Sequence, residues 1–297
     1  MMAKDAGCRP ARPAVDCRAA VSDTDDSDAF KDFEAAGWSA NAPGYGALTG
    51  RITARFADRL LDAARVGPGT RVLDAGCGHG DLCAAAAARG ARTVGIDLAE
   101  GMVRAARAAH PELDFRVADA EDLPFADGDF DAALAAFVVN HQPHPERGAR
   151  ELQRVVAPGG RVAVAMWDRP ERVEFLGLLD AAMQAAHVNP PLAFPPGPPA
   201  YRFADEGELR ALLEGAGLRD IGIETVELTY AIEDVDELWA GVLTGSVRTA
   251  AQIRAMDDDQ QARVRGALDE LLEDRRADSG LELETAVKIA VGVTPAA

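Results

Sequence analysis

The feature that most constrains this chain is a regular alternation of short apolar runs with helix-patterned segments between residues 70 and 167. An apolar run that leads into an amphipathic segment and then into another apolar run is typical of a parallel sheet with helices on its faces. The run VAVAMW lacks polar alternation, which indicates a strand buried on both sides. We therefore expect an α/β fold. Strands are predicted at 70–76, 92–98, 114–120, 129–139 and 161–167, and helices at 81–90, 100–110 and 149–160.

The segments that flank this core have a different texture. Residues 1–28 contain few large apolar groups, which predicts a disordered tail. The remainder, 29–297, is expected to form a single domain with its core at about 60–168. Six prolines within 190–199 predict a stiff loop. Beyond the core we predict helices at 171–188, 205–217 and about 233–277, and further strands at 221–232 and 281–293.

Composition excludes several classes of function. The chain has 31 Lys and Arg against 49 Asp and Glu, a net charge of −18, and such a chain repels nucleic acid. No apolar run approaches the roughly 18–20 residues that span a bilayer, and the first residues lack the apolar region of a signal peptide. We therefore expect a cytoplasmic protein whose partner is a small molecule.

No metal site is expected. The four cysteines, at 8, 17, 77 and 83, do not have the paired spacing of a zinc site. The acidic run at 257–259 precedes a helical pattern, so we interpret it as charge at a helix N-terminus.

The glycine-rich segment VLDAGCGHG follows the first predicted strand and precedes a helix. Gly76, Gly78 and Gly80 allow a sharp turn and the close approach of a ligand. A dinucleotide fingerprint would need a third glycine at position 81, where this chain has Asp81, and that carboxylate would repel a pyrophosphate. The loop, preceded by Asp74, thus favours a ligand without phosphate over a nicotinamide cofactor.

Two further acids lie at the ends of the next predicted strands. Asp97 ends the second strand, where an acid can accept hydrogen bonds from ribose hydroxyls. Asp119 ends the third strand, where it could accept a hydrogen bond from an adenine amino group, act as the N-cap of a helix that begins at AEDL, or do both. Because the carboxyl ends of parallel strands share one sheet edge, these acids should border one ligand.

The motifs VLDAGCGHG, TVGIDLAEGM, VADAEDLPF, FDAALAAF and LQRVVAPGGRVAVAMW occur in this order. In them the chain resembles the class I S-adenosylmethionine-dependent methyltransferases over about residues 45–168. It is most similar to the small-molecule branch that includes ubiquinone and menaquinone biosynthesis methyltransferases. The resemblance implies a Rossmann-like, seven-stranded, mostly parallel sheet with an antiparallel last strand. It also implies an N-terminal cover and a helical lid, which we place at 29–59, 169–200 and 233–277.

The resemblance implies S-adenosylmethionine as the cofactor and assigns residues to it. Asp74 and the three glycines would contact its methionine portion, Asp97 its ribose, and Met102 its adenine region. The full set of expected cofactor-binding residues is Tyr45, Asp74, Gly76, Gly78, Gly80, Asp97, Met102, Asp119, Ala120 and Asn140.

Fewer sequence features predict which residues bind the methyl acceptor. Asn140 and His141 follow the fourth predicted strand and should project toward the transferred methyl group. His141 could remove a phenolic or enolic proton, or it could cap the next helix or contact the cofactor. Trp38 could shield the cofactor or simply pack on the sheet. The expected substrate-lining residues are Trp38, Trp167, Trp239, Ser246 and Arg248.

These patterns predict methyl transfer to an oxygen or carbon atom of a small, partly apolar metabolite, and secondary metabolism is one setting for such a reaction. A general base is needed only where the acceptor must lose a proton. The alternative is an S-adenosylmethionine-binding protein of the same fold that acts as a cyclase or scaffold without methyl transfer. The identity of the acceptor and the oligomeric state are not encoded in any pattern that we recognise.

Overall fold

The central sheet has the strand order β3-β2-β1-β4-β5-β8-β6 in this computed structural model, which describes residues 24–277 and 280–296. Strands β1 to β5 are parallel, whereas β8 runs antiparallel to both β5 and β6. The predicted mixed sheet with an antiparallel last strand is therefore confirmed. The strands are β1 (Arg71–Ala75), β2 (Arg92–Asp97), β3 (Asp114–Val117), β4 (Phe130–Ala136), β5 (Val156–Trp167), β6 (Arg219–Ile232), β8 (Gly280–Val293) and the short β7 (Arg276–Ala277), which pairs with β8.

Helices cover both faces of this sheet. Along β4, the neighbours Ala132 and Ala133 are both buried but belong to different apolar clusters, as expected when side chains alternate across a strand. One cluster includes α3 and α4, and the other includes α6 and α8. The helices are α1 (Thr24–Tyr45), α2 (Thr49–Thr53), α3 (Ala57–Ala63), α4 (Asp81–Ala88), α5 (Glu100–Ala109), α6 (Pro145–Arg154), α7 (Glu174–Ala185), α8 (Glu206–Gly215), α9 (Val235–Gly245), α10 (Arg248–Arg254) and α11 (Asp258–Leu272).

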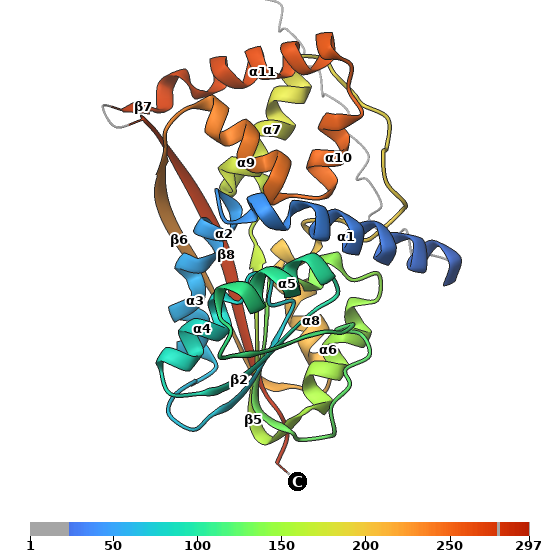
Figure 1. Cartoon of the computed structure of the whole chain (residues 1–297), viewed down its shortest axis with the longest axis vertical. Coiled ribbons are helices and arrows are strands. Elements are labelled where there is room, and N and C mark those ends of the chain that lie inside the picture. Colours follow the sequence, from blue (N-terminus) through green and yellow to red (C-terminus); the bar gives the residue numbers. More distant parts are fainter. Residues whose placement is uncertain (1–23, 278–279, 297) are drawn as a thin grey trace, which may run out of the picture.

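Four helices, α7, α9, α10 and α11, form a separate layer beyond one end of the sheet, which we call the upper helical layer (Figure 1). The long strands β6 and β8 extend from the core into this layer, and α1 lies between the layer and the core (Figure 1). Contacts of α1 with both α5 and α9 confirm this position. Helix α1 therefore lies at the boundary between the core and the upper helical layer.

Some predicted boundaries are wrong. The stretch 233–277 is not one helix but three, because the chain breaks at Ser246 and again at Asp257, whose side chain caps α11 in a capping box with Gln260. That cap confirms the interpretation of the acidic run at 257–259. The helix predicted to continue to residue 160 ends at Arg154, and Pro158 lies within β5.

The predicted tail is also too long. Helix α1 begins at Thr24, so residues 24–28 are helical, and residues 1–23, including Cys8 and Cys17, lie outside the described residues. Asp26 and Asp28 lie in the first turns of α1, where negative charge is favourable. No helix among the described residues is both long and apolar enough to cross a membrane.

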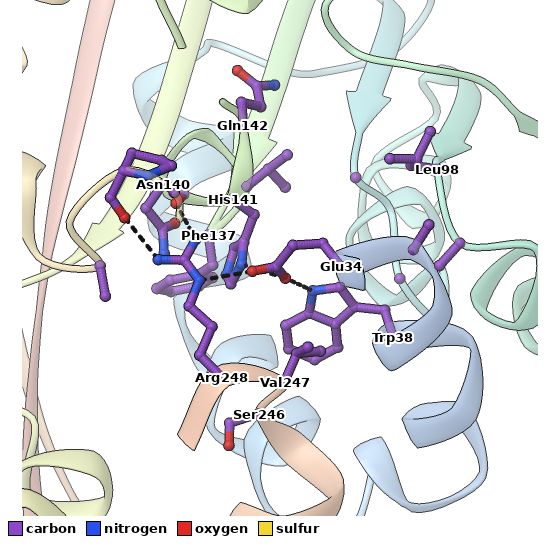
Figure 2. A pocket seen from close by; sticks show the side chains of 18 of the residues that line it. Glu34, Trp38, Leu98, Phe137, Asn140, His141, Gln142, Ser246, Val247 and Arg248 are labelled. Atoms are coloured by element: carbon purple, nitrogen blue, oxygen red, sulfur yellow. Dashed lines mark hydrogen bonds and ion pairs between the residues drawn. The ribbon is translucent and has the colours of Figure 1, made fainter. Parts of the chain in front are cut away.

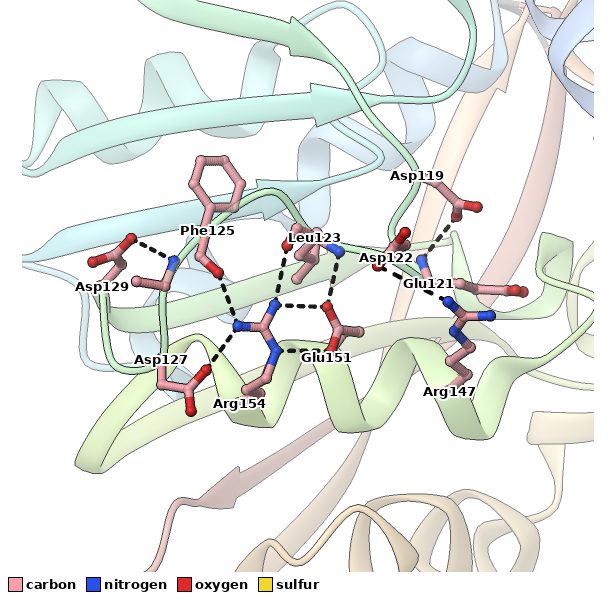
Figure 3. A network of polar contacts seen from close by, with 11 residues as sticks. Asp119, Glu121, Asp122, Leu123, Phe125, Asp127, Asp129, Arg147, Glu151 and Arg154 are labelled. Carbon is pink, nitrogen blue, oxygen red and sulfur yellow. Dashed lines mark hydrogen bonds and ion pairs between the residues drawn. The ribbon is translucent and has the colours of Figure 1, made fainter.

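The loop that follows β3 is held against α6 by one arginine (Figure 3). Arg154 donates to the backbone oxygens of Leu123 and Phe125 at 3.0 and 2.8 Å, and its guanidinium pairs with Glu151 at 2.7 Å. Glu151 in turn accepts from the Leu123 amide at 2.8 Å. This network fixes the segment that carries Asp119 to the sheet edge.

Candidate active site

The glycine loop leaves β1 and folds back over the end of β2. Gly76 and Cys77 both donate their backbone N–H to the carbonyl of Ile96, at 2.7 and 2.8 Å. The Gly78 N–H donates to Oδ2 of Asp97 at 3.0 Å. All three glycines of the loop have positive φ, which explains why the chain needs glycine there.

Two of these glycines differ in what surrounds them. A Cβ on Gly78 would meet only Tyr45, at 3.9 Å, so this position opens into the cavity. A Cβ on Gly80 would lie 2.6 Å from the Phe115 ring, and Gly80 does not border the cavity. The prediction of cofactor contact at Gly80 is therefore corrected, because this glycine starts α4 and packs on Phe115.

A cavity of about 480 Å³ runs from this loop toward the upper helical layer. One end, which we call the loop end, is bordered by the residues that follow β1, β2 and β3. The other, the aromatic end, is bordered by residues of the loop after β4, of β5, α7 and α10, and of the loop before α8. The loop end includes Gly76, Gly78, Asp97, Met102, Asp119 and Ala120, and the aromatic end includes Phe137, Trp167, Phe175, Asp180, Tyr201 and Gln252.

Asp97 lies where the sequence placed it and also supports the loop. Its Oδ1 accepts from the Ala99 amide at 2.8 Å and its Oδ2 from Gly78. Burial raises the pKa of Asp97, and these two backbone donors oppose that shift. Because a carboxylate has about four acceptor sites, it can hold the loop and still accept from a ligand.

Asp119 also borders the cavity, but it already has a partner. Its Oδ2 lies 2.7 Å from Nζ of Lys31 on α1, and its Oδ1 accepts from the Glu121 amide at 2.8 Å. Lys31 pairs equally closely with the buried Glu121. Burial would lower the pKa of Lys31, yet the two acids raise it. Asp119 thus caps a turn and not the predicted helix, because the described chain between β3 and β4 contains no helix, and its pair with Lys31 anchors α1 at the loop end.

An apolar slot lies beside these acids. Met102 is buried and packs with Ala42 and Ala99, and Trp38 and Tyr45 lie against this group. The rings of Trp38 and Tyr45 meet edge to face with centroids 5.9 Å apart. These two aromatic residues of α1 therefore border the cavity, and shielding of the cofactor by them stays a prediction.

Asp74 borders a second, smaller cavity of about 60 Å³, together with Gly76 and Gly78. Its Oδ2 accepts from the Cys83 thiol at 3.4 Å, whereas its buried Oδ1 has no partner among the described residues. Burial raises the pKa of Asp74 to about 7. The smaller cavity therefore contains a buried acceptor that a cationic or hydrogen-bond-donating ligand would satisfy.

Glu34 of α1 connects three elements above the cavity (Figure 2). Its Oε1 accepts from Nε of Arg248 at 2.7 Å, while its Oε2 lies 3.0 Å from both Nδ1 of His141 and Nε1 of Trp38. Arg248 also donates to the backbone oxygen of Asn140 at 2.7 Å. Burial would raise the pKa of Glu34, but His141 and Arg248 hold it below its usual value.

The aromatic end begins directly after β4. Phe137 has a φ of 60°, which is unusual for a bulky residue, and its ring stacks on Trp167 with centroids 4.1 Å apart. Trp167 meets Phe175 of α7 edge to face at 5.2 Å. Asn140 is buried nearby, and its Oδ1 has no partner among the described residues. A strained backbone beside a cavity is typical of a functional position.

Four of the five predicted substrate-lining residues border the cavity: Trp38, Trp167, Ser246 and Arg248. Trp239 does not, which corrects that prediction. It is buried within α9, and the guanidinium of Arg265 lies 5.9 Å from its ring. A helix in this layer has one face toward the cavity and another toward the core, and Trp239 is on the core face.

Sequence reasoning missed several cavity residues. Phe137 carried a signal, because it follows a predicted strand at the ligand-binding edge of the sheet. Glu34 lies one helical turn before Trp38, but nothing in its local sequence indicates two distant partners. The missed residues are Lys31, Glu34, Phe137, Gln142, Asp180 and Tyr201. Among the described residues, no group of three or more His, Cys, Asp or Glu could hold a metal ion.

Comparison with known proteins identifies the family. Residues 73–164 match the family model described as a methyltransferase domain. The chain is 35% identical over 188 residues to a demethylmenaquinone methyltransferase of Beutenbergia cavernae, covering 59% of this chain and 78% of that protein. The chain belongs to the class I S-adenosylmethionine-dependent methyltransferases. Its predicted Rossmann-like fold and cofactor are thereby confirmed.

Other relatives agree. A demethylmenaquinone methyltransferase of Renibacterium salmoninarum is 36% identical to the chain over 118 residues. The match covers 40% of the chain and 50% of the Renibacterium protein. The solved structure of the YcgJ protein from Bacillus subtilis has a TM-score of 0.55 at 18% identity. The match covers 82% of this chain and 99% of the YcgJ chain. At that identity, the likeness concerns the fold alone.

The residues present fit S-adenosylmethionine. Gly78 leaves space where a Cβ would project into the cavity. The unpartnered Oδ1 of Asp74 would receive a donor from the cofactor's ammonium group. A phosphate would fit less well, because the carboxylate of Asp97 is hydrogen-bonded to the same loop and would repel it.

Proposed function

We propose that this methyltransferase acts on an oxygen or carbon atom of a small, partly apolar metabolite, and that secondary metabolism is one setting for it. The observation that carries the proposal is the continuity of one cavity from the glycine loop to the aromatic end. A cofactor at the loop end and an apolar acceptor at the aromatic end would be adjacent. Such alignment of two reactants can supply much of the rate.

The loop-end residues would hold the cofactor. Asp97 would accept from its ribose hydroxyls, since the carboxylate retains acceptor sites beyond its two backbone donors. Met102 and Ala120 would contact the adenine ring. Asp74, which borders the smaller cavity on the other side of the glycine loop, would accept from the ammonium group. S-adenosylmethionine, when bound, supplies a methyl group that its sulfonium already activates.

The contact of Asp119 with the cofactor depends on its existing pair with Lys31. Its Oδ2 is paired with Lys31, so a hydrogen bond to the adenine amino group would share or replace that contact. Tyr45 and Asn140 would complete the cofactor site, since both border the cavity between its two ends. Helix α1 therefore bears directly on cofactor affinity.

His141 is our candidate general base. Glu34 is a carboxylate acceptor, so its contact with Nδ1 favours the tautomer in which Nδ1 carries the proton. The Nε2 atom then has a free lone pair, and among the described residues it has no hydrogen-bond partner. This arrangement suits removal of a phenolic or enolic proton.

Three segments would act as a lid that excludes water: α1, the proline-rich loop and α10. Arg248 ties them together, donating to the Pro198 carbonyl at 2.9 Å and pairing with Glu34. The ring of Phe194 in the proline-rich loop also stacks on Phe33 of α1 with centroids 5.5 Å apart. Release of a reactant would require these contacts to open.

A methyl-transfer screen over phenols, quinols and polyketide-like compounds, read by mass spectrometry, tests the proposal. We expect methylated phenolic or enolic products together with S-adenosylhomocysteine. If a compound is consumed without methylation, the cyclase alternative is favoured instead. If no compound is converted although the cofactor binds, the scaffold alternative is favoured.

A further inference from the structure

Asp180 is a carboxylate at the aromatic end that has no role in the account above. It lies on α7, borders the cavity and is largely shielded from solvent. Among the described residues, its carboxylate has no hydrogen-bond or ion-pair partner. Burial of this group raises its pKa to about 6. A largely desolvated carboxylate without a partner is costly unless a ligand compensates it.

The cavity's own cations do not compensate Asp180. Lys31 is held by Asp119 and Glu121 at the loop end. Arg248 is held by Glu34 at 2.7 Å. Both permanently charged cations that border the cavity, and His141 as well, are therefore engaged by other acids, and none of them pairs with Asp180. A bound molecule can supply the missing positive charge.

The surroundings of Asp180 define the shape of that molecule. Tyr201 and the stacked pair of Phe137 and Trp167 border the same end of the cavity. Asp180 borders it too, and its negative charge adds to the effect of burial in raising the pKa of the Tyr201 phenol. Aromatic rings accept both apolar bodies and cationic groups.

We propose that Asp180 selects the methyl acceptor by pairing with a protonated amino group on an apolar or aromatic body. This inference rests on the proposed function and narrows its substrate class. The body packs against Phe137 and Trp167, while the ammonium group reaches Asp180. A neutral hydroxyl could donate to Asp180, but it would leave the negative charge uncompensated.

The pairing also determines which atom is methylated. An ammonium group has no lone pair, so it cannot attack the methyl group while Asp180 holds it. The new bond to carbon therefore forms at another atom of the acceptor, an oxygen or carbon, as the carbon–sulfur bond of the cofactor breaks. The proton of a phenolic or enolic oxygen goes to the base. Asp180 is thus a specificity-determining residue that contacts the acceptor away from its reacting atom.

The test compares two probes that differ only in this group: tyramine, which carries an ammonium, and tyrosol, which carries a hydroxyl in its place. Each is titrated by calorimetry into the full chain saturated with S-adenosylhomocysteine. The variants are Asp180→Asn and the control Glu171→Gln. Glu171 also raises the pKa of Tyr201, but its side chain is exposed and does not border the cavity.

In the unmodified protein we expect tyramine to bind about tenfold more tightly than tyrosol, or better. Asp180→Asn should reduce that ratio to about one, while Glu171→Gln should preserve it. Affinity for S-adenosylhomocysteine should be unchanged in both variants, which reports that the cofactor end remains folded.

Equal binding of the two probes, no binding of tyramine, or an unchanged ratio in Asp180→Asn would each overturn the inference. These results would leave the proposed methyl transfer intact as long as S-adenosylhomocysteine still binds. Failure of S-adenosylhomocysteine to bind would instead contradict the proposed function itself.

Discussion

The Oε2 atom of Glu34 lies 3.0 Å from Nδ1 of His141, although the two residues are far apart in the sequence. The same carboxylate binds Arg248, so one buried acid joins the N-terminal helix, the loop after β4 and α10. Its side chain is only 4% exposed. Closure of the cavity and orientation of the candidate base thus depend on the same residue.

Glu34→Gln should destabilise the protein by about 3 kcal/mol, because Arg248 would remain buried without a counter-charge. Urea unfolding measures this change. The matched control is Glu100→Gln, which removes an exposed pair with Arg104 and should cost only about 0.3 kcal/mol. Equal costs for the two variants would show that the Glu34 network does not stabilise the fold.

Gly78→Ala and Gly80→Ala should separate binding from folding. Both place alanine at positive φ, which costs about 1 kcal/mol. Gly78→Ala should lower the affinity for S-adenosylhomocysteine about tenfold or more, because its methyl group enters the cavity. Gly80→Ala should instead lower the free energy of unfolding by a further ~1–3 kcal/mol through collision with Phe115.

Calorimetry and urea unfolding of both glycine variants provide the comparison. The assignment of the two glycines is contradicted if Gly78→Ala binds S-adenosylhomocysteine as the unmodified protein does. It is equally contradicted if Gly80→Ala shows no greater loss of stability than Gly78→Ala.

Protonation of Asp74 should make the free energy of unfolding depend on pH. Its pKa is raised to about 7 in the folded chain from its ordinary value of 3.8, so the folded state binds a proton that the unfolded state has lost. The stability from this group is therefore fully present below pH 3.8 and is lost as pH rises toward 7. Asp74→Asn removes the titration, and the cofactor-free variant should gain roughly 1–4 kcal/mol over the unmodified protein at pH 8, and less than half of that gain at pH 5.

Urea unfolding of both proteins at the two pH values, without cofactor, measures the Asp74 effect. A gain of equal size at pH 5 and pH 8 would contradict the raised pKa. The same variant should bind S-adenosylhomocysteine more weakly at pH 8, since it lacks the charge that we assign to the ammonium group.

His141→Ala tests the candidate base. If His141 accepts a proton from the acceptor, kcat should fall by about 10²–10⁴-fold while the affinity for S-adenosylhomocysteine changes little. His144→Ala is the control, because His144 is exposed and does not border the cavity. Loss of cofactor affinity with little change in kcat would show that His141 is a structural or cofactor-contacting residue instead.

The sequence predicts the sheet and the loop end well because both depend on local patterns. The glycines require positive φ, and Asp97 follows its strand directly, so neighbouring residues identify these features. The aromatic end depends on helices far apart in the chain. Glu34 and Asp180 are ordinary acids in helical sequence, and only packing brings them to the cavity. The prediction that Trp239 lines the cavity was wrong for a related reason. Its helix has two buried faces, and the sequence does not tell which of them borders the cavity.

The most direct test of the account is a single-turnover experiment with S-adenosylmethionine that carries a tritium-labelled methyl group. The acceptor is the compound with the highest turnover in the screen. We predict that the label leaves the cofactor and appears on an oxygen or carbon of the acceptor, one methyl group for each S-adenosylhomocysteine formed. Label that stays on the cofactor while the acceptor is converted to another product would contradict methyl transfer.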